Sequence, residues 1–429
     1  MNKWNFHLIV PLVVILLSII PAKAQLELIN LGTLDGDSST ATAINDRGEI
    51  VGNITSGDGV TGVTHAFYYR DGLMRSLDSR PCNAVAINDS GQIVGSLLTY
   101  TTNIFTNIIS PPIPISTNIV FTNILTPPAP AMTIPVSNQN VNGILVTNLQ
   151  IVTNLVINSQ PVLFRPGLSV NLLEGPNNGG FAWGINNQSE IVGAVNLFNS
   201  NTQYAFVCAG GLTMDLPELS DAYAPSAAAA INNHGDIVGF SQIGVSSEHP
   251  FLYSQGLMHD LGTLGGSIAA AKAINDAGEI TGYSLTISNG EIHAFLYRNG
   301  QMIDLGGLPD AQFSTSTTSI GFSPPISVSS ASAINNWGQI VGVATANNGA
   351  IHAFLYSEGT MVDLNRLVKL THANGPPGFL VLTEANGIND LGQIVGAGTF
   401  WDGRQQATRA FLLNLSHELL PSRDYFPPP

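Results

Sequence analysis

The sequence predicts an all-β chain folded as a seven-bladed β-propeller, and three observations predict it. One unit recurs seven times, with about 43–60 residues in every copy except the second, which carries a long insert. Each copy holds short apolar runs separated by Asn, Asp and Gly, which are typical of tight turns between strands. No segment after the N-terminal region has an apolar stripe of helical spacing. Four strands per repeat is the pattern of a propeller blade.

The most regular block reads Ile-Asn-Asp-x-Gly-x-Ile-Val-Gly, or a close variant of it, and predicts two strands joined by a tight turn. It stands at residues 44–52, 87–95, 185–193, 231–239, 274–282, 334–342 and 388–396. An Asn follows the first Ile in all copies, and we expect its side chain to bond the backbone of the turn. These residues are Asn45, Asn88, Asn186, Asn232, Asn275, Asn335 and Asn389.

The third and fourth strands of each repeat are predicted from a His-Ala-Phe-Leu-Tyr block, clearest at 293–297, and a Met-x-Asp-Leu block, as at 302–305. The last repeat ends after 409–413 without a clear fourth strand, whereas residues 28–34 form an orphan copy of that strand. We expect this N-terminal strand to complete the last blade, which would close the ring and remove exposed sheet edges. An open β-solenoid with unpaired terminal strands is the alternative.

These blocks resemble those of the extracellular HAF-repeat family, named for its His-Ala-Phe triplet. The triplet stands at 65–67, 293–295 and 352–354, and an Asp-Leu-Gly-x-Leu-Gly-Gly block stands at 260–266. The second and third repeats lack the His-Ala-Phe form. The resemblance covers about residues 26–415 outside the insert. It implies export and no known activity.

Residues 1–24 have the pattern of a secretory signal peptide. Lys3 precedes an apolar run from Leu8 to Ile20, and a small-x-small site predicts cleavage after Ala24. The run is shorter than the roughly 20 residues that span a bilayer, which disfavours an uncleaved anchor. The sequence therefore predicts a secreted protein. A C-terminal tail, residues 416–429, follows the repeats.

The charge of the chain argues against a nucleic-acid partner. The formal net charge is −15, with 29 acidic against 14 basic residues, and phosphate binding needs clustered Lys and Arg. Export permits a disulfide. Cys82 and Cys208 either pair or remain two buried thiols, and their spacing leaves both alternatives open.

Residues 97–160 form the insert in the second repeat. No charged residue occurs between Asp89 and Arg165, and Thr-Asn-Ile or Thr-Asn-Leu occurs six times. Alternating polar and apolar residues predict an extended two-stranded arm, in which prolines limit edge pairing. Such an arm would dock a partner, a second copy of the chain or a membrane surface. Low-complexity drift is the other interpretation.

Length variation among the repeats points to one functional face. The first-to-second and third-to-fourth turns have fixed lengths, whereas the other two connections vary and should emerge at the same end of a propeller. Binding residues collect on variable loops held by a rigid scaffold, although variation there is also simply tolerated. Aromatic residues near these connections would bind a glycan or an extracellular protein, or else cap the blade core. They are Phe181, Trp183, Tyr223, Phe313, Phe322 and Phe379.

An enzyme is the alternative function, a glycoside hydrolase or lyase with carboxylates on the variable loops. The residues in question are Glu174, Glu218, Asp221, Asp310 and Glu384. The sequence has no Gly-x-Ser-x-Gly, His-Glu-x-x-His or phosphate-binding loop motif. We therefore expect a binding module with no catalytic residue and no cofactor.

The repeated histidines do not predict a metal site. His65, His249, His293 and His352 occupy equivalent positions in different blades, so they cannot converge on one ion. We expect each to bond a neighbouring blade. The same interpretation applies to the fourth-strand acids Asp215, Asp260, Asp304 and Asp363.

Overall fold

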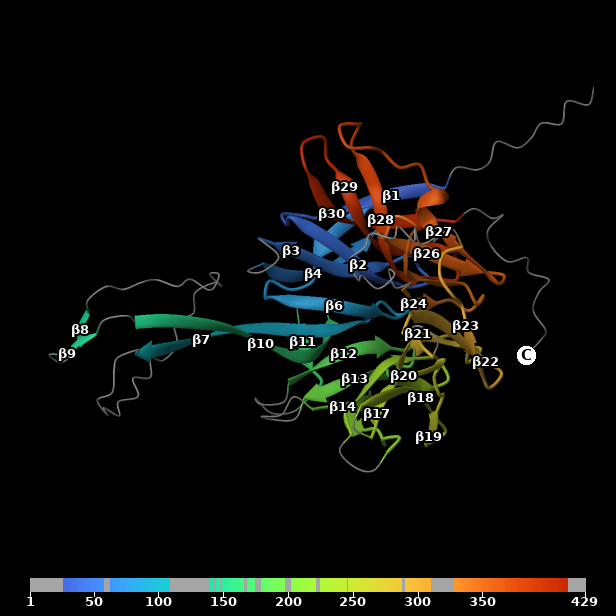
Figure 1. Ribbon diagram of the computed structural model, residues 1–429, viewed down its shortest axis with the longest axis horizontal. Coiled ribbons are helices and arrows are strands. Elements are labelled where there is room, and N and C mark those ends of the chain that lie inside the picture. The colour runs from blue at the N-terminus through green and yellow to red at the C-terminus, as the bar shows by residue number, and fades with distance from the viewer. Residues whose placement is uncertain are drawn as a thin grey trace, which may run out of the picture.

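The computed structural model describes residues 26–57, 62–108, 139–141, 144–146, 149–165, 168–173, 179–196, 202–220, 224–244, 246–287, 290–309 and 328–415. The prediction of an all-β chain is confirmed, because these residues form thirty strands and one short 3-10 helix, η1 (Leu364–Arg366) (Figure 1). No helix in this part of the chain has the length and apolar character needed to span a membrane. The predicted signal peptide and the C-terminal tail lie outside the described residues.

The strands form four-stranded antiparallel arrays. In hydrogen-bonded order the first three are β2 (Ser38–Ile44), β3 (Ile50–Ser56), β4 (Val63–Arg70) and β5 (Leu73–Ser76); β6 (Cys82–Ile87), β7 (Ile93–Ile108), β10 (Leu149–Arg165) and β11 (Leu168–Asn171); and β12 (Gly179–Ile185), β13 (Ile191–Asn196), β14 (Gln203–Ala209) and β15 (Leu212–Asp215). A separate pair is β8 (Gln139–Val141) with β9 (Ile144–Val146).

The next three arrays continue this order along the chain. They are β16 (Ser226–Ile231), β17 (Ile237–Ile243), β18 (Ser247–Ser254) and β19 (Leu257–Asp260); β20 (Gly265–Ile274), β21 (Ile280–Thr286), β22 (Ile292–Arg298) and β23 (Gln301–Asp304); and β24 (Ser329–Ile334), β25 (Ile340–Thr345), β26 (Ile351–Ser357) and β27 (Thr360–Asp363). A single parallel contact between Glu248 and Ile268 joins the first two of these into one eight-stranded sheet.

The last array combines the two ends of the described chain. It consists of β28 (Gly378–Ile388), β29 (Gln393–Trp401) and β30 (Gln406–Asn414), with β1 (Glu27–Gly32) paired antiparallel to β30. Asn30 in β1 lies opposite Phe411, just as Asp304 lies opposite Phe295 in another array. The Asn30 side chain also accepts a hydrogen bond from the backbone two residues on, as Asp304 does. Strand β1 thus takes the position that the fourth strand takes elsewhere.

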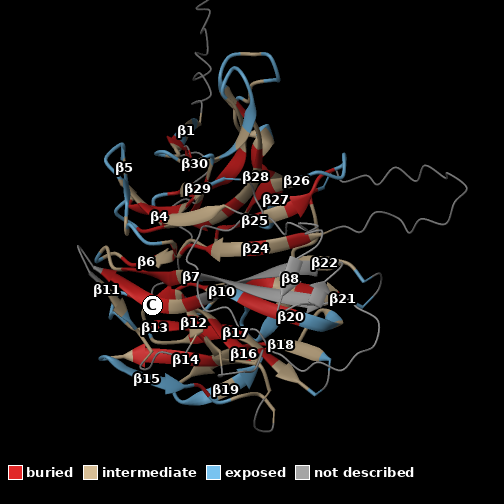
Figure 2. Cartoon of the chain, turned by 90° about the vertical axis from the view of Figure 1, so that its left-hand side faces the viewer, coloured by how far each residue is buried: buried red, intermediate tan, exposed pale blue. Residues whose placement is uncertain are grey.

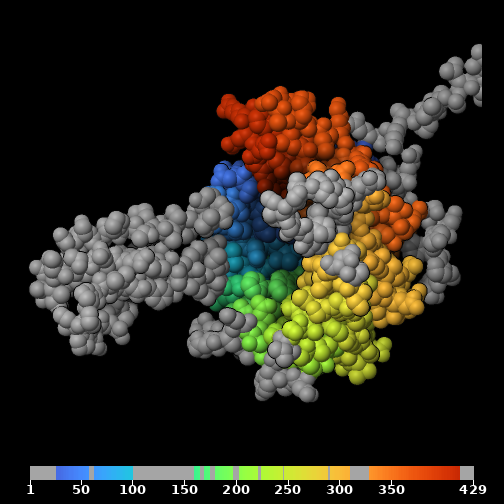
Figure 3. Space-filling view, in the orientation of Figure 1, coloured from blue at the N-terminus to red at the C-terminus, as the bar shows by residue number. Residues whose placement is uncertain are grey.

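The core lies between neighbouring arrays, where the third strand of each contributes a buried phenylalanine (Figure 2). Phe67 packs with Ile44 and Ile50 of its own array and with Val395 and Leu412 of the last one. This contact joins the beginning of the described chain to its end, and the space-filling view shows the blue and red segments side by side (Figure 3).

The glycine that closes each Ile-Val-Gly block is required by this packing. A Cβ atom at Gly52 would lie 2.2 Å from the carbonyl oxygen of Thr40 and 2.6 Å from the ring of Phe67. The same crowding occurs at Gly342, where a Cβ would lie 2.9 Å from the Phe354 ring. Only a residue without a side chain lets the inner strands approach this closely.

Candidate functional site

The seven repeated Asn residues build the inner-strand turns. In the first repeat, the Asn45 Oδ1 atom accepts hydrogen bonds from the backbone N–H groups of Arg47 and Glu49, at 3.1 and 2.9 Å. The chain therefore reverses around one amide side chain, which satisfies backbone donors that a tight turn leaves free. All seven Asn residues are buried.

The Nδ2 group of each Asn also reaches the neighbouring array, which the sequence analysis did not anticipate. Asn45 donates to the carbonyl oxygen of Asn88 at 2.9 Å. The same bond follows from each Asn to the next, and Asn389 donates to the carbonyl oxygen of Asn45 at 2.9 Å. The bonds form a circuit that returns to its starting residue.

A second circuit uses the residue that follows each Asn. The backbone N–H of Asp46 donates to the Asp89 Oδ1 atom at 3.0 Å, and that of Asp390 donates to the Asp46 Oδ1 atom at 2.8 Å. The residue at this position is Asp or Asn in every repeat. The sequence pattern predicts a turn from these residues but not the contact between arrays. The members are Asp46, Asp89, Asn187, Asn233, Asp276, Asn336 and Asp390.

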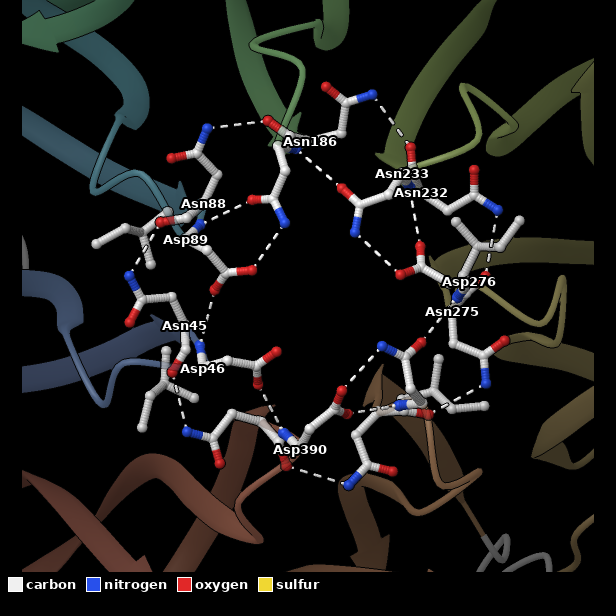
Figure 4. A pocket seen from close by; sticks show the side chains of 18 of the residues that line it. Asn45, Asp46, Asn88, Asp89, Asn186, Asn232, Asn233, Asn275, Asp276 and Asp390 are labelled. Carbon is white, nitrogen blue, oxygen red and sulfur yellow. Dashed lines mark hydrogen bonds between the residues drawn. The ribbon is translucent and has the colours of Figure 1, made fainter. Parts of the chain in front are cut away.

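The two circuits line a polar cavity of about 180 Å³ at the centre of the arrays (Figure 4). Four-stranded antiparallel arrays placed around a common axis are the arrangement of a β-propeller. In the described part of the chain, no three His, Cys, Asp or Glu side chains lie close enough together to hold a metal ion. The cavity is therefore a ring of carboxylate and amide groups without a metal-binding cluster.

Three of the four ring carboxylates accept a hydrogen bond from a ring amide group. Asn187 donates to the Asp89 carboxylate at 2.7 Å, and the two remaining pairs have distances of 2.9 Å. Asp46 is the exception, because the ring members on either side of it are Asp89 and Asp390. The cavity wall partly shields Asp46 from bulk water, which raises the pKa of its carboxyl above its ordinary value, and the charges of Asp390, Asp89 and Asp276 raise it further, against the hydrogen bond from the Asp390 backbone. The side chain nevertheless remains accessible to solvent.

The use of these polar atoms indicates what the cavity does. Ring side chains accept backbone N–H groups from the adjacent array, and the amide N–H groups bond neighbouring carboxylates. These side chains stabilise the fold only while their partners are present, since a buried N–H group without an acceptor lowers the free energy of unfolding. We infer that the axial ring serves chiefly to lock the arrays together.

Three of the four repeated histidines pair within their own arrays, so the expectation that each bonds a neighbouring blade is wrong for these three. The Nδ1 atoms of His249, His293 and His352 lie 2.7–3.0 Å from carboxylate oxygens of the outer strand. Each acid lies opposite the Phe that stands two residues after the His, so His and acid share one face of the sheet. The partners are Asp260, Asp304 and Asp363.

Small polar side chains form another link between arrays. The backbone N–H of Ala66 donates to the Cys82 sulfur at 3.4 Å, and three further bonds of this kind are Ala205 to Ser226, Ala294 to Ser329 and Ala410 to Ser39. Where the donor position is a proline, which has no N–H, the acceptor position is occupied by Gly or Ala. These pairs are Pro161 with Gly180 and Pro250 with Ala269.

Cys82 and Cys208 are both free and buried. Burial raises the pKa of the Cys82 thiol to about 11, which keeps it protonated at neutral pH. Cys82 therefore acts as a small packing residue and hydrogen-bond acceptor.

The structure places the three described aromatic candidates in strands. Phe181 and Trp183 lie in β12, where their half-buried rings stack with centroids 5.9 Å apart. Phe379 lies in β28 and is only 4% exposed, packed edge-on against Phe400 and Phe411. Phe379 is thus part of the core and offers no ring face to a ligand. Tyr223, Phe313 and Phe322 lie outside the described residues.

Of the five carboxylates considered for an enzyme, two are described. Glu218 accepts a hydrogen bond from the backbone N–H of Ala224 at 2.7 Å, and Glu384 lies within β28. Glu174, Asp221 and Asp310 lie outside the described residues. The hydrolase or lyase hypothesis stays a prediction.

The topology separates the two ends of the molecule. Strands such as β2 run toward the axial cavity and β3 runs away from it, so the β3–β4 and β5–β6 connections lie at the opposite end, and the other arrays follow the same order. One of the longest connections expected from the sequence, residues 365–387 between the fourth-strand Leu364 and the turn residue Ile388, is partly strand, because β28 begins at Gly378. Among the described residues, the axial ring and the variable connections therefore occupy different ends.

Comparisons with known proteins concern the fold. A scan against family models matched none, and a search of curated proteins also found no match. The β-propeller domain of the Trilobed protease from Pyrococcus furiosus is 7% identical, with 89% of this chain and 95% of that chain covered and a TM-score of 0.45. TolB from Acinetobacter baumannii is 10% identical, with 86% and 80% covered and a TM-score of 0.36.

Proposed function

We propose that the chain is an exported, non-catalytic binding protein, built as a closed seven-bladed β-propeller that holds a glycan or an extracellular protein at its variable end. The export part rests on the N-terminal sequence pattern at residues 1–24. The family assignment suggested by the His-Ala-Phe repeats is part of the same proposal.

Ring closure is supported by three contacts between the first and last repeats. Strand β1 pairs with β30, Asn389 bonds Asn45, and the core around Phe67 includes side chains from both ends. A blade completed by strands from both termini leaves no open sheet edge at the junction. In this proposal the N-terminal strand is the clasp of the ring.

The contrast between the two ends carries the binding proposal. At the cavity end, turns of constant length commit their side chains to neighbouring arrays. At the other end, the number of residues between the fourth-strand Leu and the turn Ile of the next repeat ranges from 9 to 28. Rigid scaffolds with one variable end commonly place their binding residues there. We assign ligand binding to the variable end and ring locking to the cavity end.

The stacked Phe181 and Trp183 rings would extend this surface along the axial wall, because they lie in β12, which runs from the variable end toward the cavity. Trp183 occupies the same place in its inner strand as Thr42 and Asn386, counted back from the Ile of the turn. Thr42 and Asn386 bond the inner strand of the next array, so this position faces along the axial wall. A half-exposed aromatic pair on that wall is a suitable platform for a sugar ring or an aromatic side chain.

The test is binding of residues 25–429 to glycan and extracellular-protein arrays. We expect a ligand whose affinity falls at least tenfold in Trp183→Ala. Trp337→Ala is the matched control, because Trp337 lies at the cavity end, where its indole bonds the Asp390 carbonyl. Thermal unfolding of both variants separates lost binding from lost folding. Absence of any ligand, or an equal loss in the control, contradicts the proposal.

A further inference from the structure

The inner strand of every array has an irregular position two residues before the Ile of its turn. The register with the second strand shifts there by one residue, which is the pattern of a β-bulge. None of the bulged residues is buried, whereas the Ala before each of them is. The bulged Thr42 and Asn386 bond the next inner strand, so these positions form one level of the axial wall. They are Thr42, Val85, Trp183, Ala229, Lys272, Ser332 and Asn386.

Lys272 is the cation of this level. The seven inner strands contain two charged residues, Lys272 and Glu384, although the chain as a whole is acidic. In the other arrays the bulged position carries a neutral side chain. Packing between arrays therefore does not require a charge at this position, and the positive charge of Lys272 needs another explanation.

The ammonium group of Lys272 is held in a defined place. Its Nζ atom donates a hydrogen bond to the Ser330 Oγ atom at 3.1 Å and lies 5.4 Å from the centre of the Tyr283 ring. The side chain is exposed, yet the surrounding protein shields it from water enough to lower the pKa of the amine. Among the described residues, no carboxylate forms an ion pair with Lys272. An ammonium group can donate three hydrogen bonds, so two N–H groups remain for an incoming acceptor.

Aromatic rings lie at the same level of the wall. Trp183 is the bulged residue of β12, and its ring stacks on that of Phe181 with centroids 5.9 Å apart. Both residues are half-buried, so part of each ring is open to solvent. Lys272 and Trp183 thus place an ammonium group and an aromatic face on one wall. A sugar acid carries a carboxylate and a ring with apolar C–H faces on a single unit, which matches both groups.

We propose that the axial wall binds a sugar acid, whose carboxylate pairs with the Lys272 ammonium group while its ring lies against Trp183. This inference rests on the proposed binding function and names the class of its ligand. An acidic side chain of a protein would also pair with Lys272. It would bring only one or two methylene groups to Trp183, however, so the aromatic pair favours a sugar.

The first test uses the small number of lysines. The chain from residue 25 onward contains two, Lys272 and Lys369, so isotopic labelling of lysine gives two amine signals in NMR spectra. Methyl glucuronide should raise the pKa of Lys272, because a nearby carboxylate favours the charged amine, and the Lys369 signal is the internal reference. Methyl glucoside has the same ring without the carboxylate and should leave Lys272 unchanged. No response of Lys272 to methyl glucuronide overturns the proposal.

Affinities of variants assign the two contacts separately. We expect methyl glucuronide to bind residues 25–429 about tenfold more tightly than methyl glucoside, and Lys272→Gln to remove this preference. Lys272→Arg keeps the charge and should retain most of the preference. Arg75→Gln, at an exposed position of the outer strand β5, changes the net charge equally and should have no effect. Trp183→Ala should weaken both sugars alike, because it removes the contact with the ring.

The outcomes distinguish this inference from the function on which it rests. Absence of methyl glucuronide binding, equal affinities of the two sugars, or a preference that survives in Lys272→Gln overturns the inference. Tighter binding of N-acetylglutamate amide than of methyl glucuronide assigns Lys272 to an acidic protein and also overturns it. The proposed binding function fails on separate grounds, when the array screen finds no ligand or no specific dependence on Trp183.

Discussion

Asn389 donates a hydrogen bond from its Nδ2 atom to the carbonyl oxygen of Asn45 at 2.9 Å, although the two residues are 344 positions apart. The next residue repeats the connection, because the backbone N–H of Asp390 donates to the Asp46 carboxylate at 2.8 Å. These bonds join the last array to the first at the cavity end, while the pairing of β1 with β30 joins the ends of the chain within the last array.

Substitution Asn389→Ala should destabilise the fold by about 2–3 kcal/mol, because several buried hydrogen-bonding groups lose their partner together. The Asn389 side chain also accepts from the backbone of Leu391 and Gln393. Asn347→Ala, at an exposed position, is the control and should stay within about 0.5 kcal/mol. Denaturant unfolding measures both, and an equal effect would argue against a structural role of the ring.

Substitution Cys82→Ser should leave stability nearly unchanged, whereas Cys82→Val should cost about 1–3 kcal/mol. Serine fills the equivalent position as Ser39, Ser226 and Ser329, so it can accept the Ala66 N–H bond, whereas valine leaves that buried donor unsatisfied. Equal unfolding free energies of the two variants would show that the bond is unimportant.

Pro250 has no N–H group, so the hydrogen bond that joins other neighbouring arrays is absent between the fourth and fifth, and substitution should restore it. We expect the unfolding free energy of the double variant Pro250→Ala with Ala269→Ser to exceed the value calculated by adding the effects of the two single substitutions by about 0.5–1.5 kcal/mol. The reason is that only the double variant has both the backbone N–H and the hydroxyl group that bond in other arrays. A double-mutant cycle of unfolding free energies measures the coupling. A coupling energy near zero would refute the interpretation of the Pro/Ala pairs.

Substitution Asp46→Asn should stabilise the fold, by less than about 1 kcal/mol at neutral pH because the carboxylate is exposed to solvent in the cavity. The pKa of Asp46 is raised in the folded state, so its contribution to stability is present at acidic pH and is lost as pH rises through the folded pKa. The advantage of the variant should therefore appear as pH rises through the ordinary Asp pKa of about 4 and level off above the raised folded pKa. Thermal unfolding across this range tests it, and an advantage that shrinks with rising pH would contradict the assignment.

Turn chemistry made the strands predictable, while contacts between arrays were not. The residues around Asn45 contain the Asn and Gly that form the chain reversal, so the turn is predictable from local sequence. The hydrogen-bond partner of the Asn45 side chain lies in the next repeat, and no local sequence feature specifies how two arrays align with each other. The pairing of His293 with Asp304 can be predicted from the sequence, because the same separation of 11 residues between His and Asp recurs in three repeats. The role of Cys82 as a hydrogen-bond acceptor can also be predicted, because Cys82 lies five residues before the Ile of its turn, at the position that Ser39 and Ser329 occupy in other repeats.

The placement of Phe379 failed for a different reason. Strand β28 contains three register irregularities, at 379–381, 382–384 and 385–387. Each extra residue shifts the alternation of buried and exposed positions, so the period of two that identifies a strand is absent. The sequence of this segment therefore predicts a long loop with Phe379 on its surface, whereas the structure has a strand in which Phe379 is buried.

Removal of residues 25–34 tests the central claim, that the N-terminal strand completes the last array and closes the ring. Leu31 is buried and packs in the core shared by the first and last arrays, so the truncated chain should melt at a much lower temperature and aggregate through the exposed β30 edge. A peptide of residues 25–34 should partly restore the melting temperature, and removal of residues 416–429 should not change it. A truncated chain that melts like the parent would contradict the account.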